Sequence, residues 1–318
     1  MNEALIEQAR RELVIASRIL IISHIRPDGD AVGSMLGLGL ALQEAGKTVQ
    51  MVLVDGVPSS EKHLTGSDQV HHKPEGEFDL IIVVDCSDLD RVGEALDVYG
   101  KPDWNIDHHI TNLNFARLNL VQADAASTAE MLAELIPAWN LPLPAGVVSA
   151  LLTGILTDTI GFRTSNVSPK TLRIAADLVE AGGNIHGLYY HALLQRSYQA
   201  ARYWGQGLSK LKREGRMVWT TLTASDRHSA EYCGRDDADL INVVSAIDDT
   251  DVALIFVEQN RSHVKVSWRS QPGFDVSQIA LRFGGGGHKA AAGADVEGTL
   301  EEVEEKVLTA TRSLWGTA

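Results

Sequence analysis

The stretch Arg18-Ile-Leu-Ile-Ile-Ser-His24-Ile-Arg-Pro-Asp28-Gly-Asp30 decides how this chain can fold. Its first part is almost wholly aliphatic, which predicts a strand over 18–24 that is buried on both faces, as in a parallel sheet. Pro27 and Gly29 then predict a tight loop, and residues 31–45 have the pattern of a helix. Strand, loop and helix form one unit of an α/β fold, in which ligands gather where strands end. His24, Asp28 and Asp30 stand at that point.

The same alternation continues through the first 190 residues. Apolar runs predict strands over 49–55 and 80–85, a short strand is predicted over 103–107, and periodicity predicts helices over 129–139, 145–156 and 169–181. Ser127-Thr-Ala-Glu130 is the pattern of a capping box. A second α/β unit follows, with strands predicted over 217–222, 252–258 and 264–268 and helices over 276–283 and 300–315. We therefore predict an α/β protein with a domain over 1–190, a helical linker over 191–215 and a smaller domain over 216–318, with helical periodicity running through 185–211.

The charge of the chain restricts its ligands. The 318 residues have a formal net charge of −14, and residues 1–190 hold 13 basic and 25 acidic groups. Long nucleic acid is usually held by a strongly basic surface, so we expect no long nucleic acid as partner. Residues 261–290 differ, with five basic groups and one acidic group. That window could meet a phosphate or could be a solvated strand face.

The apolar runs, the N-terminal residues and the number of cysteines also indicate a cellular location. No apolar run is long enough to span a bilayer, and the N-terminus lacks the features of a signal peptide. Cys86 and Cys233 are too few for a disulfide framework in a chain of this size. We expect a cytoplasmic protein without a membrane partner.

Carboxylates and imidazoles recur at the ends of predicted elements. Asp85 ends a wholly apolar run, where a carboxylate is costly unless it is paired or coordinated. Asp107-His108-His109 ends the next predicted strand, and Asp158 ends the apolar segment that begins at Val147. Each could instead be a helix cap, a salt bridge or part of a polar loop. Together with His24, Asp28 and Asp30 they can converge on one edge of a sheet, and such donors suit divalent cations.

A glycine run, Gly284-Gly-Gly-Gly287-His288-Lys289-Ala-Ala-Ala-Gly293, stands in the second unit. Glycine lets backbone N–H groups approach an anion closely. The run lacks the Gly-Lys-Ser/Thr ending of a Walker loop. By itself it is more typical of a flexible loop.

In combination these motifs resemble those of the DHH phosphoesterase family, which is named for the motif present here as Asp107-His108-His109. Within that family the chain is most similar to the nanoRNase-type proteins, which degrade very short oligoribonucleotides and dephosphorylate 3′-phosphoadenosine 5′-phosphate. Those proteins usually have glycine where this chain has Ile160, so local loop shape and substrate preference stay open. The segments that carry the resemblance are His24 to Ala31, Asp85 with Arg91-Val-Gly93, Asp107 to Asn112, Ser127 to Glu130, Thr157 to Thr159, Trp268 to Ser270 and Gly285 to Gly293.

The resemblance implies a parallel-sheet DHH domain, a smaller α/β DHH-associated domain and two divalent metal ions. Manganese is expected because imidazole suits transition metals, with magnesium or cobalt as alternatives. The implied ligands are His24, Asp28 and Asp85 for one ion and Asp30, Asp85, His108 and Asp158 for the other. The implied catalytic residues are Asp85, Asp107 and His109. The implied substrate-binding residues are His109, Arg269, Ser270, Gly285, Gly286, Gly287 and His288.

The activity implied is two-metal hydrolysis of very short oligoribonucleotides or of 3′-phosphoadenosine 5′-phosphate, in a cleft between the domains. A phosphodiesterase for cyclic or linear dinucleotides is an alternative with the same two domains. A manganese pyrophosphatase would need a denser basic cluster, and the net charge disfavours a processive exonuclease. A nucleotide-binding regulatory module would be expected to lack a metal ligand, and none is missing. The partners expected are the substrate and, as an open alternative, a second copy of the chain.

Overall fold

The computed structural model describes residues 2–316, which divide into two compact units between Gln195 and Arg196. Both units are α/β, as the sequence predicts. The stretch 191–215, predicted as a helical linker, contains the last helical turn of the first unit and a helix whose Tyr203 is fully buried in the core of the second. None of the helices between residues 2 and 316 has both the length and the apolar character needed to cross a bilayer.

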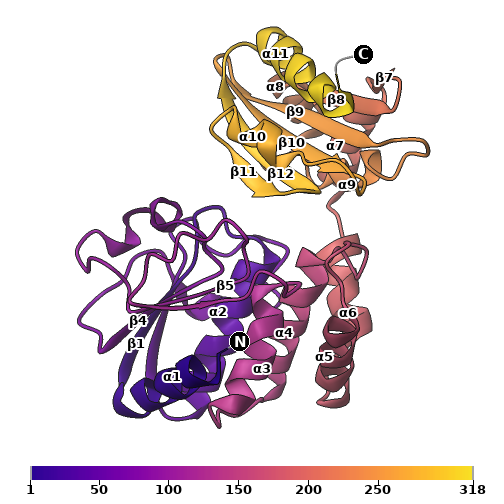
Figure 1. The fold of residues 1–318 in the computed structure, drawn as a ribbon. Helices are drawn as coiled ribbons and strands as arrows, with labels where there is room; N and C mark the ends of the chain where they lie inside the picture. The colour runs from indigo at the N-terminus through magenta and orange to yellow at the C-terminus, as the bar shows by residue number, and fades with distance from the viewer. Residues whose placement is uncertain (1, 317–318) are drawn as a thin grey trace. The chain divides into compact units, whose positions relative to one another are not determined.

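The first unit is built on a parallel sheet of six strands (Figure 1), in the order β3-β2-β1-β4-β5-β6. The chain leaves β1 toward β2 and β3, then returns to place β4 on the other side of β1. The strands are β1 (Arg18–Ile22), β2 (Thr48–Val52), β3 (Val70–His71), β4 (Leu80–Val84), β5 (Trp104–Asp107) and β6 (Leu118–Val121). The gap between β1 and β4 is thus a topological switch point, where α/β sheets bind ligands.

Both faces of this sheet are covered, which explains why its central strands are apolar throughout. Ile19, Ile21 and Ile82 belong to a cluster that also contains the helices, whereas Leu20 and Ile22 pack against the segment η2. The helical segments are α1 (Glu3–Ile15), α2 (Gly29–Glu44), η1 (Ser67–Gln69), η2 (Leu89–Leu96), α3 (Thr128–Ala138), α4 (Ala145–Asp158), α5 (Pro169–Glu180), α6 (Ile185–Tyr189) and η3 (Tyr190–Leu194).

Helices α2 and α4 lie unusually close together because α2 has glycine at every fourth position. A Cβ atom on Gly29 would lie 2.4 Å from the Thr157 side chain, and one on Gly33 would lie 2.5 Å from the carbonyl oxygen of Ala150. Residues four apart share one helix face, so these glycines form one contact stripe. The close approach brings the C-terminus of α4 to the loop that follows β1.

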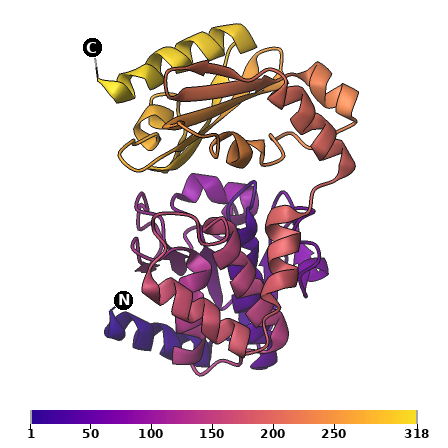
Figure 2. The same ribbon diagram turned by 90° about the vertical axis from the view of Figure 1, so that its right-hand side faces the viewer.

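The second unit has a mixed sheet in the order β11-β12-β10-β9-β8-β7, in which β8 and β9 are parallel and the other pairs antiparallel. The helix α11 lies along one face (Figure 2), and α7, α8 and α9 pack on the other. The elements are α7 (Tyr198–Leu208), β7 (Lys212–Glu214), β8 (Met217–Leu222), α8 (Ala224–Ala230), α9 (Leu240–Val244), β9 (Val252–Asn260), β10 (His263–Ser270), α10 (Ser277–Leu281), β11 (Gly286–His288), β12 (Ala291–Glu297), α11 (Leu300–Arg312) and η4 (Ser313–Trp315).

Two local predictions differ from the structure. Part of the glycine run is not a loop, because residues 286–288 form β11 and pair with β12. The periodic stretch 185–211 is not one helix: backbone at Gln195 is extended, and Ser197 caps a new helix by accepting a hydrogen bond from the N–H of Ala200. The Ser197 hydroxyl caps the start of a new helix, so the earlier helix ends before it even though the periodic pattern of the sequence continues.

Candidate metal centre

The predicted ligands meet at the carboxyl-terminal edge of the first sheet. Because β1, β4 and β5 are parallel neighbours, their ends lie side by side. His24 follows β1, Asp85 follows β4 directly, and His108 follows β5. The three side chains are almost completely buried, with at most 3% of each residue exposed.

Asp85 is central to this cluster. Its Oδ2 lies 3.7 Å from His24 Nε2, and its Oδ1 lies 3.8 Å from His108 Nε2. Oδ1 also accepts a hydrogen bond of 2.9 Å from the hydroxyl of Thr128. The backbone of Asp85 is left-handed, with φ of 54°, a conformation that aspartate adopts more readily than most residues. This strained turn directs the carboxylate between two neighbouring strands.

Asp30 connects the cluster to the N-terminus of α3. Its carboxylate accepts hydrogen bonds from the backbone N–H groups of Thr128, at 2.7 Å, and Ala129, at 2.9 Å. These N–H groups have no partner within the helix, and the helix dipole favours a negative charge there. The predicted cap is present, since Ser127 accepts from the N–H of Glu130, but the Glu130 carboxylate accepts from the N–H of Ala126. The helix start therefore fixes Asp30 and Asp85 together.

Asp28 and Asp158 complete the set of carboxylates. Asp28 is the N-cap of α2, and its Oδ1 accepts from the N–H groups of Asp30 and Ala31, both at 3.1 Å. Asp158 is the last residue of α4, and its Oδ2 lies 3.5 Å from His108 Nε2. The stripe of glycines on α2 makes this approach of α4 sterically feasible.

Both buried imidazoles present Nε2 to the carboxylates. His108 Nδ1 lies 3.3 Å from the carbonyl oxygen of Ala125, and His24 Nδ1 lies 2.8 Å from that of Ile25. A carbonyl only accepts, so in His108 Nδ1 carries the proton and Nε2 is left as a donor of its lone pair, whereas His24 Nδ1 also lies 3.2 Å from the guanidinium of Arg91, which only donates. Metal-binding histidines are commonly oriented in this way.

The electrostatics of the cluster are those of a site that lacks enough positive charge. Burial, followed by the charges of Asp85, Asp158 and Asp28, raises the pKa of Asp30 well above its usual range. Burial also raises the pKa of Asp158 to about 6, despite the nearby His108. Asp85 differs: burial opposes its charge, but His24, His109 and His108 outweigh burial and hold its pKa below the usual range. Burial lowers the pKa of His24, and Asp85 and Asp28 more than reverse this effect.

The donor set fits divalent cations. Two groups of side chains each bring one ligand atom per residue to within 4.8 Å of the others: His24, Asp28 and Asp85, and Asp30, Asp85 and His108. Ligand atoms lie roughly 2.0–2.2 Å from a metal such as zinc, so two ligands on one ion lie about 3–3.5 Å apart. The observed separations of 3.5–3.9 Å are longer than hydrogen bonds and near that spacing. Asp85 belongs to both groups, so its carboxylate is shared by the two candidate sites.

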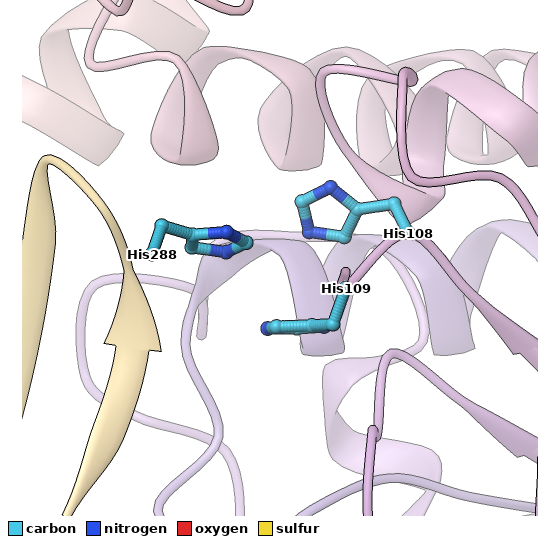
Figure 3. Close-up of side chains that lie close together, drawn as sticks. All are labelled: His108, His109 and His288. Atoms are coloured by element: carbon cyan, nitrogen blue, oxygen red, sulfur yellow. The ribbon is translucent and has the colours of Figure 1, made fainter. Parts of the chain in front are cut away.

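His109 has different surroundings from His108, its neighbour in sequence (Figure 3). The two rings are tilted by 60°, with centroids 4.7 Å apart. His109 Nδ1 lies 2.6 Å from Asp107 Oδ1, and Asp107 is fully buried. Burial would lower the pKa of His109, but Asp107 and then Asp85 raise it to about 9. Asp107 thus orients His109, not His108.

In the second unit, Arg269 and His288 are aligned across the sheet. Arg269 of β10 and His288 of β11 both pair with Ala291 of β12. Residues directly opposite on neighbouring strands share a face, so both side chains lie on the same face, roughly 10 Å apart across two strand spacings. The hydroxyl of Ser270 is within hydrogen-bonding distance of the carbonyl oxygens of Phe274 and Lys289, so it braces the end of β10.

The glycines at positions 284–287 are subject to different steric and backbone constraints. A Cβ on Gly285 would lie 2.1 Å from the carbonyl oxygen of Gly293, and Gly287 has φ of 135°. Gly284 also has positive φ. Gly286 has neither constraint, because a Cβ there would meet nothing within 4 Å. Packing therefore explains Gly285 and Gly287, whereas Gly286 has open space beside it.

Some residues of the site had no role assigned to them from the sequence. Thr128 contacts Asp85, and its only sequence signal is its place in the capping box. Arg91 lies with its guanidinium 3.2 Å from His24 Nδ1, a proximity that no local pattern predicts. The glycine stripe of α2 had a signal, the spacing of Gly29, Gly33 and Gly37.

The comparisons with known proteins agree with this architecture. Residues 18–155 match the model of the DHH family, N-terminal domain, and residues 234–315 match that of the DHHA1 domain. The bifunctional oligoribonuclease and PAP phosphatase NrnA of Thermus thermophilus is 36% identical, over 92% of this chain and 89% of that protein. The NrnA of Mycoplasma genitalium is 29% identical, over 92% and 93%. The crystal structure of an exopolyphosphatase-related protein from Bacteroides fragilis is similar, with a TM-score of 0.89 at 25% identity, and covers 98% of this chain and 96% of that one.

Proposed function

Because the chain belongs to the DHH family of phosphoesterases, we propose that it hydrolyses very short oligoribonucleotides and 3′-phosphoadenosine 5′-phosphate. The similar proteins from Thermus thermophilus and Mycoplasma genitalium bear names that state both activities. The observation that carries the proposal is that Asp85 is shared by the two donor groups that contain His24 and His108. Two divalent cations would offset the charge of the carboxylates around these two imidazoles.

In this proposal His24, Asp28 and Asp85 hold one divalent ion, and Asp30, Asp85, His108 and Asp158 hold the other. Manganese is the expected ion, because imidazole ligands favour transition metals over magnesium. When bound, such a pair acidifies a water molecule for in-line attack on phosphorus and stabilises the charge that develops. Thr128 and the N–H groups of α3 keep Asp85 and Asp30 aimed at the ions.

His109 is proposed to contact the scissile phosphate. Because its pKa is raised to about 9, His109 is an imidazolium at neutral pH, and with Nδ1 held by Asp107 its Nε2–H would donate a hydrogen bond to a phosphate oxygen. Asp85 is proposed as catalytic because it would help to hold both of the ions that supply the reacting water. Asp107 is a positioning residue, since it acts through His109.

The second unit is proposed to bind the rest of the substrate. Four carboxylates balance two divalent ions, so an incoming phosphate needs further positive partners. Arg269 and His288 share one face of the second sheet and could supply them. Gly284 and Gly286 both have open space beside them, so a phosphate could approach the backbone there. The formal net charge of −14 disfavours long nucleic acid, which favours short substrates.

The proposal also includes a cytoplasmic location, since Cys86 and Cys233 are both free thiols. The test of function is one turnover panel with manganese. It compares ribonucleotide dimers to pentamers, a long oligoribonucleotide, 3′-phosphoadenosine 5′-phosphate, cyclic di-AMP and pyrophosphate. We expect the short oligomers and 3′-phosphoadenosine 5′-phosphate to give the highest kcat/KM. Preferential turnover of cyclic di-AMP would favour the dinucleotide phosphodiesterase instead, and turnover of pyrophosphate alone would contradict the proposal.

A further inference from the structure

The side chain of Asn112 lies at the centre of a polar network behind His109. Its Nδ2 donates to Asp107 Oδ2 at 2.5 Å and to Asn105 Oδ1 at 2.7 Å, with the carbonyl oxygen of Cys86 farther away at 3.3 Å. The orientation of the amide is defined, because Asn112 Oδ1 accepts from the N–H of Asn114 at 2.7 Å. The NH2 group must therefore face the Asp107 carboxylate.

This network divides the two oxygens of Asp107 between two partners. Oδ1 meets His109 Nδ1 at 2.6 Å, and Oδ2 meets Asn112. Asp107 is fully buried, so its two side-chain partners, His109 and Asn112, satisfy most of the charge of its carboxylate. Without Asn112, one oxygen would be unsatisfied and the carboxylate would be free to turn about its last torsion. The direction in which His109 points would then no longer be fixed.

Asn105 supports Asn112 from the same strand that carries Asp107. Asn105 and Asp107 are two positions apart in β5, so their side chains lie on one face of the strand. Asn105 Nδ2 donates to the carbonyl oxygen of Cys86 at 3.0 Å, just after Asp85. The segment after β5 is held by the N–H of Leu113, which donates to the carbonyl oxygen of Ser87 in the segment after β4. The network thus connects the turn after β5 to the turn after β4.

We propose that Asn112 is a positioning residue for turnover, which acts by holding Asp107 and, through it, His109. This inference rests on the proposed function, because it assigns His109 a role on the substrate. The hydrogen bonds of Asn112 involve none of the six side chains proposed to bind the metal ions. Its loss therefore slows turnover without weakening the binding of metal ions.

The test is a double-mutant cycle with Asn112→Ala and His109→Ala, measured on a ribonucleotide dimer with manganese. We expect Asn112→Ala to lower kcat about 10- to 100-fold, the usual effect of removing a partner that orients a functional histidine, with KM changed less than about threefold. In the His109→Ala background the same substitution should have little further effect, because the two residues act in series. Manganese stoichiometry should equal that of the wild type.

The matched control is Asn119→Ala. Asn119 is also half-buried and makes two hydrogen bonds, both to the backbone of Ala116. It should lower thermal stability without a change in kcat. Asn112→Asp preserves the size of the side chain and should also lose kcat, because it faces one carboxylate with another.

Additive losses in the cycle, or an Asn112→Ala variant with wild-type kcat, would overturn the inference. So would the failure of both Asn112 variants to fold, since the network would then serve stability alone. If the wild-type protein itself does not turn over the dimer, the proposed function has failed, and that outcome is distinct from a failure of the Asn112 assignment.

Discussion

The ligand-bearing edge of the first sheet and the row of Arg269, Ala291 and His288 in the second unit are built on opposite principles. At the first edge, Asp30 and Asp85 are buried, Asp158 is half-buried and Asp28 is exposed, and each carboxylate is held by backbone N–H groups, a hydroxyl or an imidazole. In the second row, Arg269 and His288 are half-exposed on β10 and β11, beside a glycine run. The first arrangement suits cations at fixed positions, and the second suits an anion. A phosphate ester bound to metal ions needs both.

The substitution with the largest expected effect on the metal-binding edge is Asp85→Ala. Because Asp85 belongs to both donor groups, we expect its loss to lower kcat about 10³-fold or more and to weaken binding of both ions. The metal-free protein should remain folded, since one charge is removed from a cluster of like charges. Turnover, manganese stoichiometry and thermal unfolding check this result. Asp177→Ala, which changes an exposed acid on α5, is the control. Substantial activity with manganese would show that another residue bridges.

Arg269→Ala tests the second region alone. A charge-assisted hydrogen bond to a phosphate is worth about 1.5–3 kcal/mol, so we expect KM for a dimer to rise about 10- to 100-fold. Manganese stoichiometry should be unchanged, because no donor for the metals lies in the second unit of this proposal. Arg261→Ala removes an exposed cation from the β9–β10 turn and is the matched control. An unchanged KM, or a loss of bound manganese, would contradict the division between the two regions.

The dependence of stability on pH also distinguishes the carboxylate cluster of the first unit from the row of Arg269 and His288. In the metal-free protein the pKa values of Asp30 and Asp158, the latter at about 6, are raised above those of the unfolded chain. The folded state then binds protons more tightly, so this contribution to stability is full below the unfolded pKa and is lost as pH rises through the folded pKa. The raised pKa of His24 acts in the same direction.

Bound manganese replaces these protons. We therefore expect manganese to raise Tm more at pH 8 than at pH 5.5, with the difference reduced in Asp158→Asn. Thermal unfolding with manganese or with a chelator measures this. Arg269→Ala should show the wild-type difference, since it changes no ligand. An equal rise in Tm at the two pH values would mean that the carboxylates do not bind the ions.

The smallest effect concerns the turn after Asp158. Ile160 has φ of 48°, and a β-branched residue in the left-handed region is strained. Asparagine tolerates that conformation, so Ile160→Asn should raise the free energy of unfolding by up to about 1 kcal/mol and leave kcat within about twofold. Chemical denaturation checks the stability. Val98→Asn, at an exposed position without positive φ, should leave stability unchanged. A destabilised Ile160→Asn would show that contacts of the isoleucine outweigh its backbone strain.

The fold and the candidate site could be predicted from the sequence to different degrees. Strands β1 and β4 are almost wholly apolar runs followed closely by His24 and Asp85, so hydrophobicity alone locates them, whereas β5 is short, contains Asn105 and ends on Asp107. Strand β12 contains mainly alanine and glycine with charged residues, and the two residues of β3 show no period, so neither was predicted. Local patterns also cannot show that Asp30 binds the N-terminus of α3, almost a hundred residues later.

The measurement that tests the central claim most directly is anomalous scattering from crystals of the manganese-loaded protein. The account predicts two manganese peaks roughly 3.5–4 Å apart on either side of Asp85, as in other two-metal hydrolases. His24 and Asp28 should bind one ion, and Asp30, His108 and Asp158 the other. A single peak, or two peaks of which neither contacts Asp85, would contradict it.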